Sequence, residues 1–334
     1  MTTASTANSP QADTCSYQRE DGSHCPGPKE GGGQLCYWHD GDASKEAPEA
    51  TQRLEEWAAT GESMEGFVLR YAQLQGVKLY QGKQPILKNA NLFRAELPGA
   101  SMYRADLRGA ELLKSNLAGA NLNEARLEDA ELLGANFDGT RLERVQWGEQ
   151  CINERQAREA LDGGDRDQAI VKFEEAEEIY RTLRRAHDGA GHFEQAGVFF
   201  RCEMTMRRML LKPWSMARLW SRLVDMFCAY GESPPRVIVS SALFNFACAL
   251  VYWGFGVNGP DGPIGFDTAA SIKDNAYALY NCVYYSIVTF TTLGYGEITP
   301  PPGGMRILAA LQAFSGAFMM AMFVAVFGKK MTRG

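Results

Sequence analysis

The sequence predicts a multidomain membrane protein that joins a solenoid of short repeats, a helical hairpin and a C-terminal domain with two membrane-spanning helices. Three observations lead to this fold class. A pattern of period five runs through residues 90–144, apolar residues recur at helical spacing in residues 165–211, and two long segments near the C-terminus contain no charged residue. A length of 334 residues suits two to three domains. The net charge of −6 argues against nonspecific binding of nucleic acid.

The N-terminal residues divide into a tail and a candidate metal site. We expect residues 1–12 to form a disordered tail, because they are polar and lack the apolar core of a signal peptide. Residues 13–45 predict a zinc-binding loop, whose candidate ligands within Gly- and Pro-rich sequence are Cys15, Cys25, Cys36 and His39. Three thiolates and one imidazole suit tetrahedral Zn²⁺, and so short a segment is expected to need the metal to fold.

Other interpretations of this cysteine cluster stay open. His24 is a competing fourth ligand, although its adjacency to Cys25 makes binding by both residues awkward. The cysteines could instead be reactive thiols or have no joint role. Catalytic zinc is not expected, because four protein ligands leave no open coordination position.

Residues 46–84 predict a helical or irregular segment, and a repeat domain is predicted for residues 85–149. Eleven pentads run without a break from Ala90 to Arg144. The third residue of each pentad is apolar and the first is Ala in all but two; the third residues are Leu92, Leu97, Met102, Leu107, Leu112, Leu117, Leu122, Leu127, Leu132, Phe137 and Leu142. A period of five fits neither a helix nor a strand, but it fits a solenoid with one core residue per repeat.

These pentads resemble the pentapeptide-repeat family. The resemblance implies a right-handed, four-sided β-helix with four pentads per turn. Acidic and basic residues are mixed along the repeats, which argues against an acidic face that mimics DNA. The fold carries no chemistry by itself, so we expect a rigid spacer or a docking surface.

Two helical segments are predicted between the repeats and the membrane. Residues 150–211 predict a hairpin that looks TPR-like, in which residues 165–186 and 192–211 form amphipathic helices joined by a short Gly-containing link. We expect it to act as a packed adapter or oligomer contact, and peptide or ligand binding stays open. Residues 212–235 predict an interfacial amphipathic helix, because tryptophans and other apolar residues lie on one side and arginines elsewhere. This helix could be an anchor or could couple cytoplasmic movement to the membrane.

Residues 236–334 predict the membrane domain. Residues 237–257 are uncharged and long enough for an outer spanning helix, and residues 304–328 predict the inner one. Residues 275–296 are also uncharged, but this run ends in glycines whose backbone groups would be unsatisfied in lipid. We therefore predict a re-entrant helix at residues 276–291, followed by an extended loop at residues 292–296.

The loop consists of Thr292, Leu293, Gly294, Tyr295 and Gly296. This run, with its flanks, resembles the selectivity filter and pore helix of two-helix potassium channels. The resemblance implies that backbone carbonyls, together with the Thr292 hydroxyl, replace the hydration shell of K⁺. Gly294 and Gly296 allow the left-handed dihedrals that aim successive carbonyls the same way. It also implies a homotetramer, since one subunit supplies only one wall of the filter.

Three further expectations follow from the same resemblance. Gly316 stands where relatives often carry a gating hinge, and close helix packing is the alternative for this small residue. Val288 stands where some relatives place a Glu, so a carboxylate brace of that type is missing. Only one membrane helix precedes the pore helix, so the voltage-sensing helix is missing and we expect weak voltage dependence.

The distribution of Lys and Arg predicts the orientation. Basic residues cluster before the outer helix and after the inner helix, whereas residues 258–275 contain one Lys and three Asp. Two spans place both clusters on one side of the bilayer. The positive-inside rule then predicts a two-pass protein of the cell membrane with both termini in the cytoplasm.

The sequence therefore predicts a K⁺-selective channel subunit that conducts passively, is not an enzyme, and is gated through its N-terminal assembly. The expected partners are identical subunits and the lipid bilayer, with a cytoplasmic protein as an open candidate for the solenoid or the hairpin. Two alternatives stay open. One is a non-selective cation channel of the same fold, and the other is a membrane-tethered pentapeptide-repeat interaction protein that does not conduct.

Overall fold

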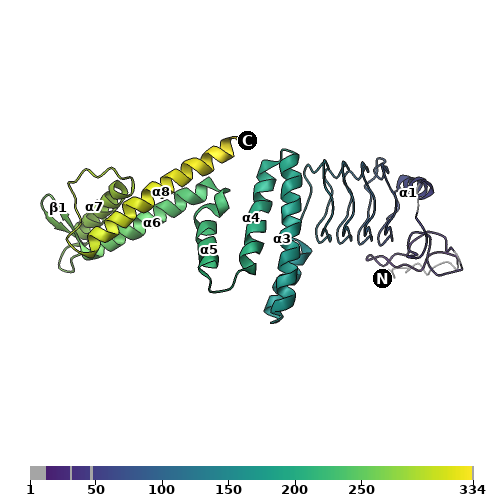
Figure 1. Cartoon of the computed structure of the whole chain (residues 1–334), viewed down its shortest axis with the longest axis horizontal. Coiled ribbons are helices and arrows are strands. Elements are labelled where there is room, and N and C mark those ends of the chain that lie inside the picture. Colours follow the sequence, from purple (N-terminus) through teal and green to yellow (C-terminus); the bar gives the residue numbers. More distant parts are fainter. Residues whose placement is uncertain (1–12, 31, 46–47, 333–334) are drawn as a thin grey trace, which may run out of the picture. The chain divides into compact units, whose positions relative to one another are not determined.

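The computed structural model of the chain describes residues 13–30, 32–45 and 48–332. The predicted tail at residues 1–12 therefore lies outside the described residues. The chain separates into two compact units, Met1–Pro213 and Trp214–Gly334. The first contains the repeats with helices α1 to α4, and the second contains α5 to α8 with a short hairpin (Figure 1).

Parallel backbone pairs join each coil of the solenoid to the next. Asn91 pairs with Glu111, and Glu111 pairs with Glu131, so equivalent residues in successive coils are 20 positions apart. This offset equals four pentads per coil. Figure 1 shows the coils stacked side by side along one axis. Hydrogen bonds such as Leu92 N–H to Glu111 C=O at 2.8 Å repeat along the stack and satisfy its backbone.

The solenoid begins earlier than the predicted boundary at residue 85. Val68, Gln73 and Lys78 already pair with the next coil, each at an offset of 23 residues. The following residue of the pattern, Ile86, stands eight positions after Lys78 rather than five, and its partner Asp106 is 20 positions away. Three inserted residues therefore interrupt the period, which explains why the first pentads are hard to recognise in the sequence.

The predicted apolar column forms the core of the solenoid. Leu92, Leu97, Met102 and Leu107 are at most 1% exposed, and Ala90 and its equivalents are fully buried beside them. Complete burial of one such large side chain stabilises a fold by about 1.5–3 kcal/mol. The stack is thus held by one buried residue per pentad and by the backbone ladder.

Separate elements cover the two ends of the solenoid. At the first coil, α1 (Glu49–Thr60) buries Ala50, Leu54 and Ala58. At the last coil stand α2 (Ile152–Asp162), α3 (Arg166–Gly189) and α4 (Phe193–Leu210). Both α2 and α4 pack against α3. The sequence predicted only the pair of helices that corresponds to α3 and α4, so α2 is an additional element.

Aromatic rings join the last coil to these helices. The Trp147 ring packs edge-on against Phe137, His187 and Phe199, with ring centroids 5.7–6.0 Å apart. The Tyr180 hydroxyl on α3 donates to Glu154 on α2 at 2.5 Å and accepts from the Cys151 N–H at 3.0 Å. Helices and repeats therefore share one continuous apolar core.

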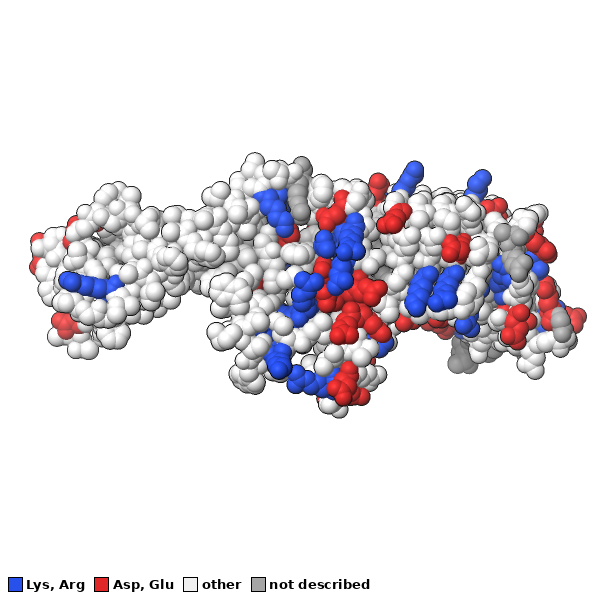
Figure 2. All heavy atoms as spheres, in the orientation of Figure 1, with Lys and Arg blue, Asp and Glu red and all other residues white. Residues whose placement is uncertain are grey.

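The second unit contains the two helices of the described residues that are long and apolar enough to cross a membrane, α6 (Pro234–Phe255) and α8 (Gly304–Thr332). They are preceded by α5 (Met216–Cys228) and the one-turn helix η1 (Ala229–Gly231). Between them, α7 (Ile272–Phe290) packs against both. Figure 2 shows that the visible surface of α6 and α8 carries no charged side chain over most of its length.

A short hairpin fastens the loop that follows α7 to the end of α6. The strands β1 (Val257–Gly259) and β2 (Gly262–Ile264) pair antiparallel directly after α6. Asn258 of β1 also exchanges two backbone hydrogen bonds with Thr299, at 2.8 and 2.9 Å. The chain that leaves the loop is therefore anchored beside the end of α6.

Candidate functional site

The predicted loop at residues 292–296 begins on the last turn of α7. The Thr292 N–H donates to the Thr289 carbonyl at 3.1 Å, and the Leu293 N–H donates to the Val288 carbonyl at 3.0 Å. These bonds hold the start of the loop close to the C-terminal end of α7. The loop itself then runs without helix or strand structure as far as Gly296.

Backbone dihedrals alternate along this loop. Thr292, Gly294 and Gly296 have φ values of 57°, 55° and 87°, whereas Leu293 and Tyr295 do not have positive φ. Alternation between left-handed and right-handed residues turns successive peptide groups the same way, so that the amides form one face and the carbonyls the other. Thr292 is a β-branched residue in the left-handed region, which is a strained backbone conformation.

Within the part of the chain that the structure describes, no hydrogen bond reaches the backbone oxygens of residues 292–295. The side chains of Leu293 and Tyr295 are 56% and 68% exposed in the single chain. Backbone carbonyls at membrane depth need a ligand, water or ion, because lipid cannot satisfy them.

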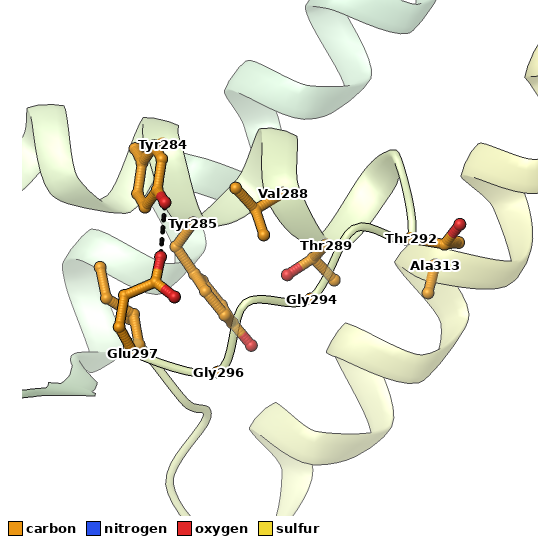
Figure 3. Close-up of a pocket in the computed structure, with 10 residues that line it drawn as sticks. Tyr284, Tyr285, Val288, Thr289, Thr292, Gly294, Gly296, Glu297 and Ala313 are labelled. Atoms are coloured by element: carbon orange, nitrogen blue, oxygen red, sulfur yellow. Dashed lines mark hydrogen bonds between the residues drawn. The ribbon is translucent and has the colours of Figure 1, made fainter.

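A cavity of about 350 Å³ lies between α7, the loop and α8 (Figure 3). Its lining consists of Tyr284, Tyr285, Val288, Thr289, Thr292, Gly294, Gly296, Glu297, Ile298 and Ala313. At one end the Tyr284 hydroxyl donates to the Glu297 carboxylate at 2.5 Å, as the dashed line in Figure 3 marks. This bond ties α7 to the residue that directly follows the loop.

The Tyr284–Glu297 bond is a connection that sequence reasoning missed. Val288 lacks the carboxylate that some relatives place there, and the cavity wall at this position is apolar. The bond instead joins two residues 13 positions apart, and its partners meet only because the loop folds back along α7. Glu297 itself was visible in the sequence as an acidic residue directly after Gly296.

Gly316 of α8 touches the end of α7. A Cβ atom at this position would lie 1.9 Å from the carbonyl oxygen of Phe290, the last residue of α7. Close packing therefore accounts for this glycine, and its role as a hinge stays a prediction.

The far end of α8 contacts the elbow between α5 and α6. Val326 is buried there with Cys228 and Val237, and Met322 and Phe323 pack around them. The Lys329 ammonium pairs with the Glu232 carboxylate in the elbow. The end of α8 and the elbow are thus in direct contact.

The predicted interfacial helix corresponds to α5. Its apolar side chains are largely exposed, including Met216 at 79% and Trp220 at 64%, and the preceding Trp214 is 99% exposed. Arg222 is also exposed on the same helix. Exposed tryptophans next to arginines are typical of a helix that lies in the headgroup region of a membrane.

The four predicted metal ligands converge in the first unit. One ligand atom each from Cys15, Cys25, Cys36 and His39 all lie within 4.8 Å of one another, and all four residues are buried. The Cys25 and Cys36 sulfurs are 3.8 Å apart, and the Cys36 sulfur is 3.3 Å from His39 Nδ1. Tetrahedral zinc with Zn–S bonds of about 2.3 Å separates two thiolate sulfurs by about 3.8 Å. The donor set and its spacing therefore fit Zn²⁺.

Neighbouring groups orient these ligands. His39 Nε2 lies 2.9 Å from the Glu65 carbonyl, so that its N–H donates there and Nδ1 faces the sulfurs. The Cys36 N–H donates to the Cys15 sulfur at 3.3 Å, and the Gly27 N–H donates to the Cys25 sulfur at 3.4 Å. His24 pairs with Gln18 in a separate bridge and does not belong to the cluster found in the described residues.

Two family models match the chain. Residues 242–333 match the ion channel family, and residues 86–123 and 110–145 match pentapeptide repeats in eight copies. No curated protein matches the chain.

Several solved pentapeptide repeat proteins are similar to the repeats. One from Nostoc Pcc 7120 is 33% identical, with a TM-score of 0.27, over 30% of this chain and 78% of that chain. Another, from the cyanobacterium Cyanothece 51142, is 34% identical, with a TM-score of 0.16, over 26% and 63%. HetL of Nostoc sp. Strain PCC 7120, described as involved in heterocyst differentiation regulation, is 36% identical, with a TM-score of 0.13, over 23% and 35%. The chain thus spans less than two thirds of the second and third proteins.

The loop with unpartnered carbonyls lies between the two apolar helices, inside the segment that matches the channel model. Both resemblances noted in the sequence are thereby confirmed at the level of the family. The chain combines two families, with pentapeptide repeats in residues 86–145 and a membrane-embedded ion channel domain in residues 242–333.

Proposed function

We propose that the protein is a subunit of a K⁺-selective channel that conducts passively through the loop at residues 292–296. The observation that carries this proposal is the set of unpartnered carbonyls of Thr292, Leu293, Gly294 and Tyr295, in a segment with alternating φ. Rings of such oxygens replace the hydration shell of K⁺ in potassium channels. The Thr292 hydroxyl adds an oxygen at the inner end.

The functional assembly in this proposal is a homotetramer. One chain provides one side of each oxygen ring, so a closed ring needs several copies around an axis. Surfaces that a neighbouring subunit would cover are exposed in the single chain: Tyr295 is 68% exposed, Tyr280 66% and Phe314 76%. Lipid covers the remaining apolar surface of α6 and α8.

The proposed topology places both termini in the cytoplasm and the loop at the outer side. The end of α8 with Lys329 and the elbow with Glu232 lie together, which supports a common side for the two basic clusters. Two spans, α6 and α8, are consistent with this arrangement.

Gating in this proposal is driven by the N-terminal unit through α5. The contact of the α5–α6 elbow with Val326 and Lys329 supplies the mechanical connection to the inner helix. Removal of residues 1–213, up to the boundary between the compact units, is expected to change the open probability and spare selectivity. Unchanged gating would reduce the first unit to an assembly or docking part.

The first unit in this proposal carries a structural Zn²⁺ ion on Cys15, Cys25, Cys36 and His39. Four protein ligands close the coordination sphere, so the metal stabilises the loop and performs no catalysis. Because His39 Nε2 bonds the Glu65 carbonyl next to the first coil, the metal would also hold the loop on the solenoid.

The experiment that tests conduction uses purified protein in liposomes. We expect K⁺ flux that barium blocks, a reversal potential near the K⁺ value in mixed K⁺ and Na⁺, and loss of flux in Gly294→Ala. Gly304→Ala is the matched control, because a Cβ at that position meets nothing within 4 Å and φ is not positive. Equal permeability to both ions would identify a non-selective cation channel. No flux would favour a membrane-tethered interaction protein.

A further inference from the structure

A fully buried amide lies where α6, α7 and α8 of the second unit meet. Gln312 of α8 is 0% exposed, and every polar atom of its side chain has a partner. Its oxygen accepts from the Tyr252 hydroxyl at 2.8 Å. The two N–H groups of its nitrogen are shared among three acceptors, Ser286 Oγ at 2.6 Å, the Ser286 carbonyl at 3.1 Å and Asn245 Oδ1 at 3.3 Å.

These partners come from the two helices that pack against α8, namely α6 and α7. Tyr252 and Asn245 belong to α6, and Ser286 belongs to α7. The Ser286 hydroxyl also donates to the Asn245 carbonyl at 2.8 Å, so α6 and α7 are joined at the same point. One side chain of the inner helix therefore connects both other helices.

Such a cluster is unusual in a membrane domain, where a polar side chain is costly unless it is paired. A leucine could fill the same space with no hydrogen bonds to satisfy. The glutamine differs from a leucine because its amide finds all its hydrogen-bond partners at only one position of α8 along α7. A fully paired polar network selects one packing arrangement of the helices, whereas apolar side chains can pack in several.

The contact between Gln312 and Ser286 continues along α7 and α8 toward the loop. Gln312 meets Ser286, and four residues later Gly316 meets the carbonyl of Phe290, four residues after Ser286. Residues four apart lie on one face of a helix, so the two contacts form a single seam between α7 and α8. The seam ends at Phe290, two residues before Thr292.

We propose that Gln312 is a positioning residue for conduction. Its amide fixes the position of α8 along α7 at which Gly316 contacts the end of α7. This contact keeps the start of the loop in its conducting geometry. This inference rests on the proposed channel function. Gln312 affects how long the loop stays conducting, whereas the carbonyls of the loop determine ion selectivity.

The test is single-channel recording of the full-length protein in planar bilayers, with three variants. Gln312→Leu removes the whole amide at similar volume, Ser286→Ala removes one hydroxyl, and Tyr252→Phe removes the bond to the amide oxygen. A lost hydrogen bond between membrane helices changes an equilibrium by about threefold. We expect open bursts about threefold shorter in Tyr252→Phe and about tenfold shorter in Gln312→Leu. The K⁺/Na⁺ permeability ratio should match the wild type in both.

Thr332→Ala is the matched control, because this exposed hydroxyl donates only within α8, to the Gly328 and Lys329 carbonyls, and lies outside the cluster. The double variant Gln312→Leu/Tyr252→Phe should be no worse than Gln312→Leu alone, since both remove the bond between the Tyr252 hydroxyl and the Gln312 oxygen. Tetramer stability on heating, measured in parallel, separates positioning from general packing.

Wild-type bursts in both Gln312→Leu and Tyr252→Phe would overturn the inference while leaving the channel function intact. A loss of tetramer stability with unchanged bursts would also overturn it, because the cluster would then only hold the helices together. If Gln312→Leu does not assemble, the milder Tyr252→Phe decides by the same criterion. A wild-type protein that does not conduct would overturn the proposed function and this inference with it.

Discussion

The α-carbon of Gly316 lies so close to the carbonyl of Phe290 that a Cβ would be 1.9 Å from the oxygen and 2.8 Å from the carbon. No real Cβ contact is that short, so any other residue at this position must push α8 away from α7. The inner helix thus supports the end of α7 through its backbone. This contact gives the helix-packing explanation of Gly316 a specific partner.

Replacement of Gly316 should therefore disrupt conduction. Gly316→Ala is expected to displace the end of α7 and abolish most K⁺ flux in liposomes. Gly328→Ala, on the same helix in open space, is the control and should conduct like the wild type, since Ala is also the better helix former. A wild-type single-channel current with an altered open probability in Gly316→Ala would instead favour a hinge.

The bond between Tyr284 and Glu297 should keep the loop conducting during sustained activity. Tyr284→Phe removes only the hydroxyl, so we expect faster decline of the current at constant voltage, with unchanged initial selectivity. Tyr280→Phe is the control, because Tyr280 is 66% exposed and stacks on Tyr277. A decline as slow as that of the wild type would show that the bond has no part in maintaining the loop.

Removal of one cysteine ligand should release the metal. Purified wild-type protein is expected to contain one zinc per chain by elemental analysis, and Cys36→Ser to contain almost none. Hydrogen exchange in residues 13–45 should then rise, because the short loop depends on the ion for its fold. Cys202→Ser on α4, outside the cluster, should retain the metal. A wild type without zinc would refute the site.

His187 should make the first unit less stable in acid. It is 2% exposed, neither ring nitrogen has a hydrogen bond to any residue that the structure describes, and burial followed by the nearby His192 lowers its pKa from 6.5 to about 4. In the unfolded chain the His187 imidazole takes up a proton as the pH falls through 6.5, whereas in the folded chain it does so only near pH 4. The free energy of unfolding therefore falls as the pH drops through this window, by about 3 kcal/mol in all.

Thermal unfolding of residues 1–213 between pH 7 and pH 4 measures this dependence. His187→Phe, which suits the surrounding Trp147 and Phe199 rings, should lose most of the decline that the wild type shows. His192→Asn should keep most of it. Equal declines in wild type and His187→Phe would assign the acid sensitivity to other groups.

The ion pair between Lys329 and Glu232 should bias the position of the inner-helix end. Lys329→Glu places two carboxylates together and is expected to shift the open probability, and Glu232→Lys should restore part of it in the double variant. Single-channel recording measures the shift. Failure of the reversed pair to restore any of it would show that this contact does not act on gating.

The repeats were predictable in the sequence wherever the period of five ran without a break. Leu69, Leu74 and Leu79 are buried core residues of the same column, but Leu87 follows eight positions after Leu79. The pairing between coils continues across this three-residue insertion, whereas a search for a strict period ends there. Helix α2 was missed for a different reason, since seven of its eleven residues are polar and it buries Asn153 and Glu154 as well as Ala157.

In the membrane unit, local composition predicted the location of the spans and of the loop. Contacts between distant residues could not be predicted in the same way. Tyr284 reaches Glu297, and Gln312 reaches Tyr252 across 60 positions, only after three helices have packed. The spacing of Cys15, Cys25, Cys36 and His39 is irregular, but their chemistry was specific enough to indicate the cluster that the fold brings together.

The cysteine-rich loop affects whether the stack of coils can grow by adding other chains. A stack of parallel coils offers unpaired amides at its first edge, and such an edge can accept another chain and grow. Here the Val68 N–H donates to the Trp38 carbonyl at 2.7 Å and the Gln73 N–H to that of Lys45, so the loop occupies this edge. The helices at the last coil occupy the other. The loop thus terminates the stack, and a chain whose loop has unfolded would expose a growing end for fibre formation.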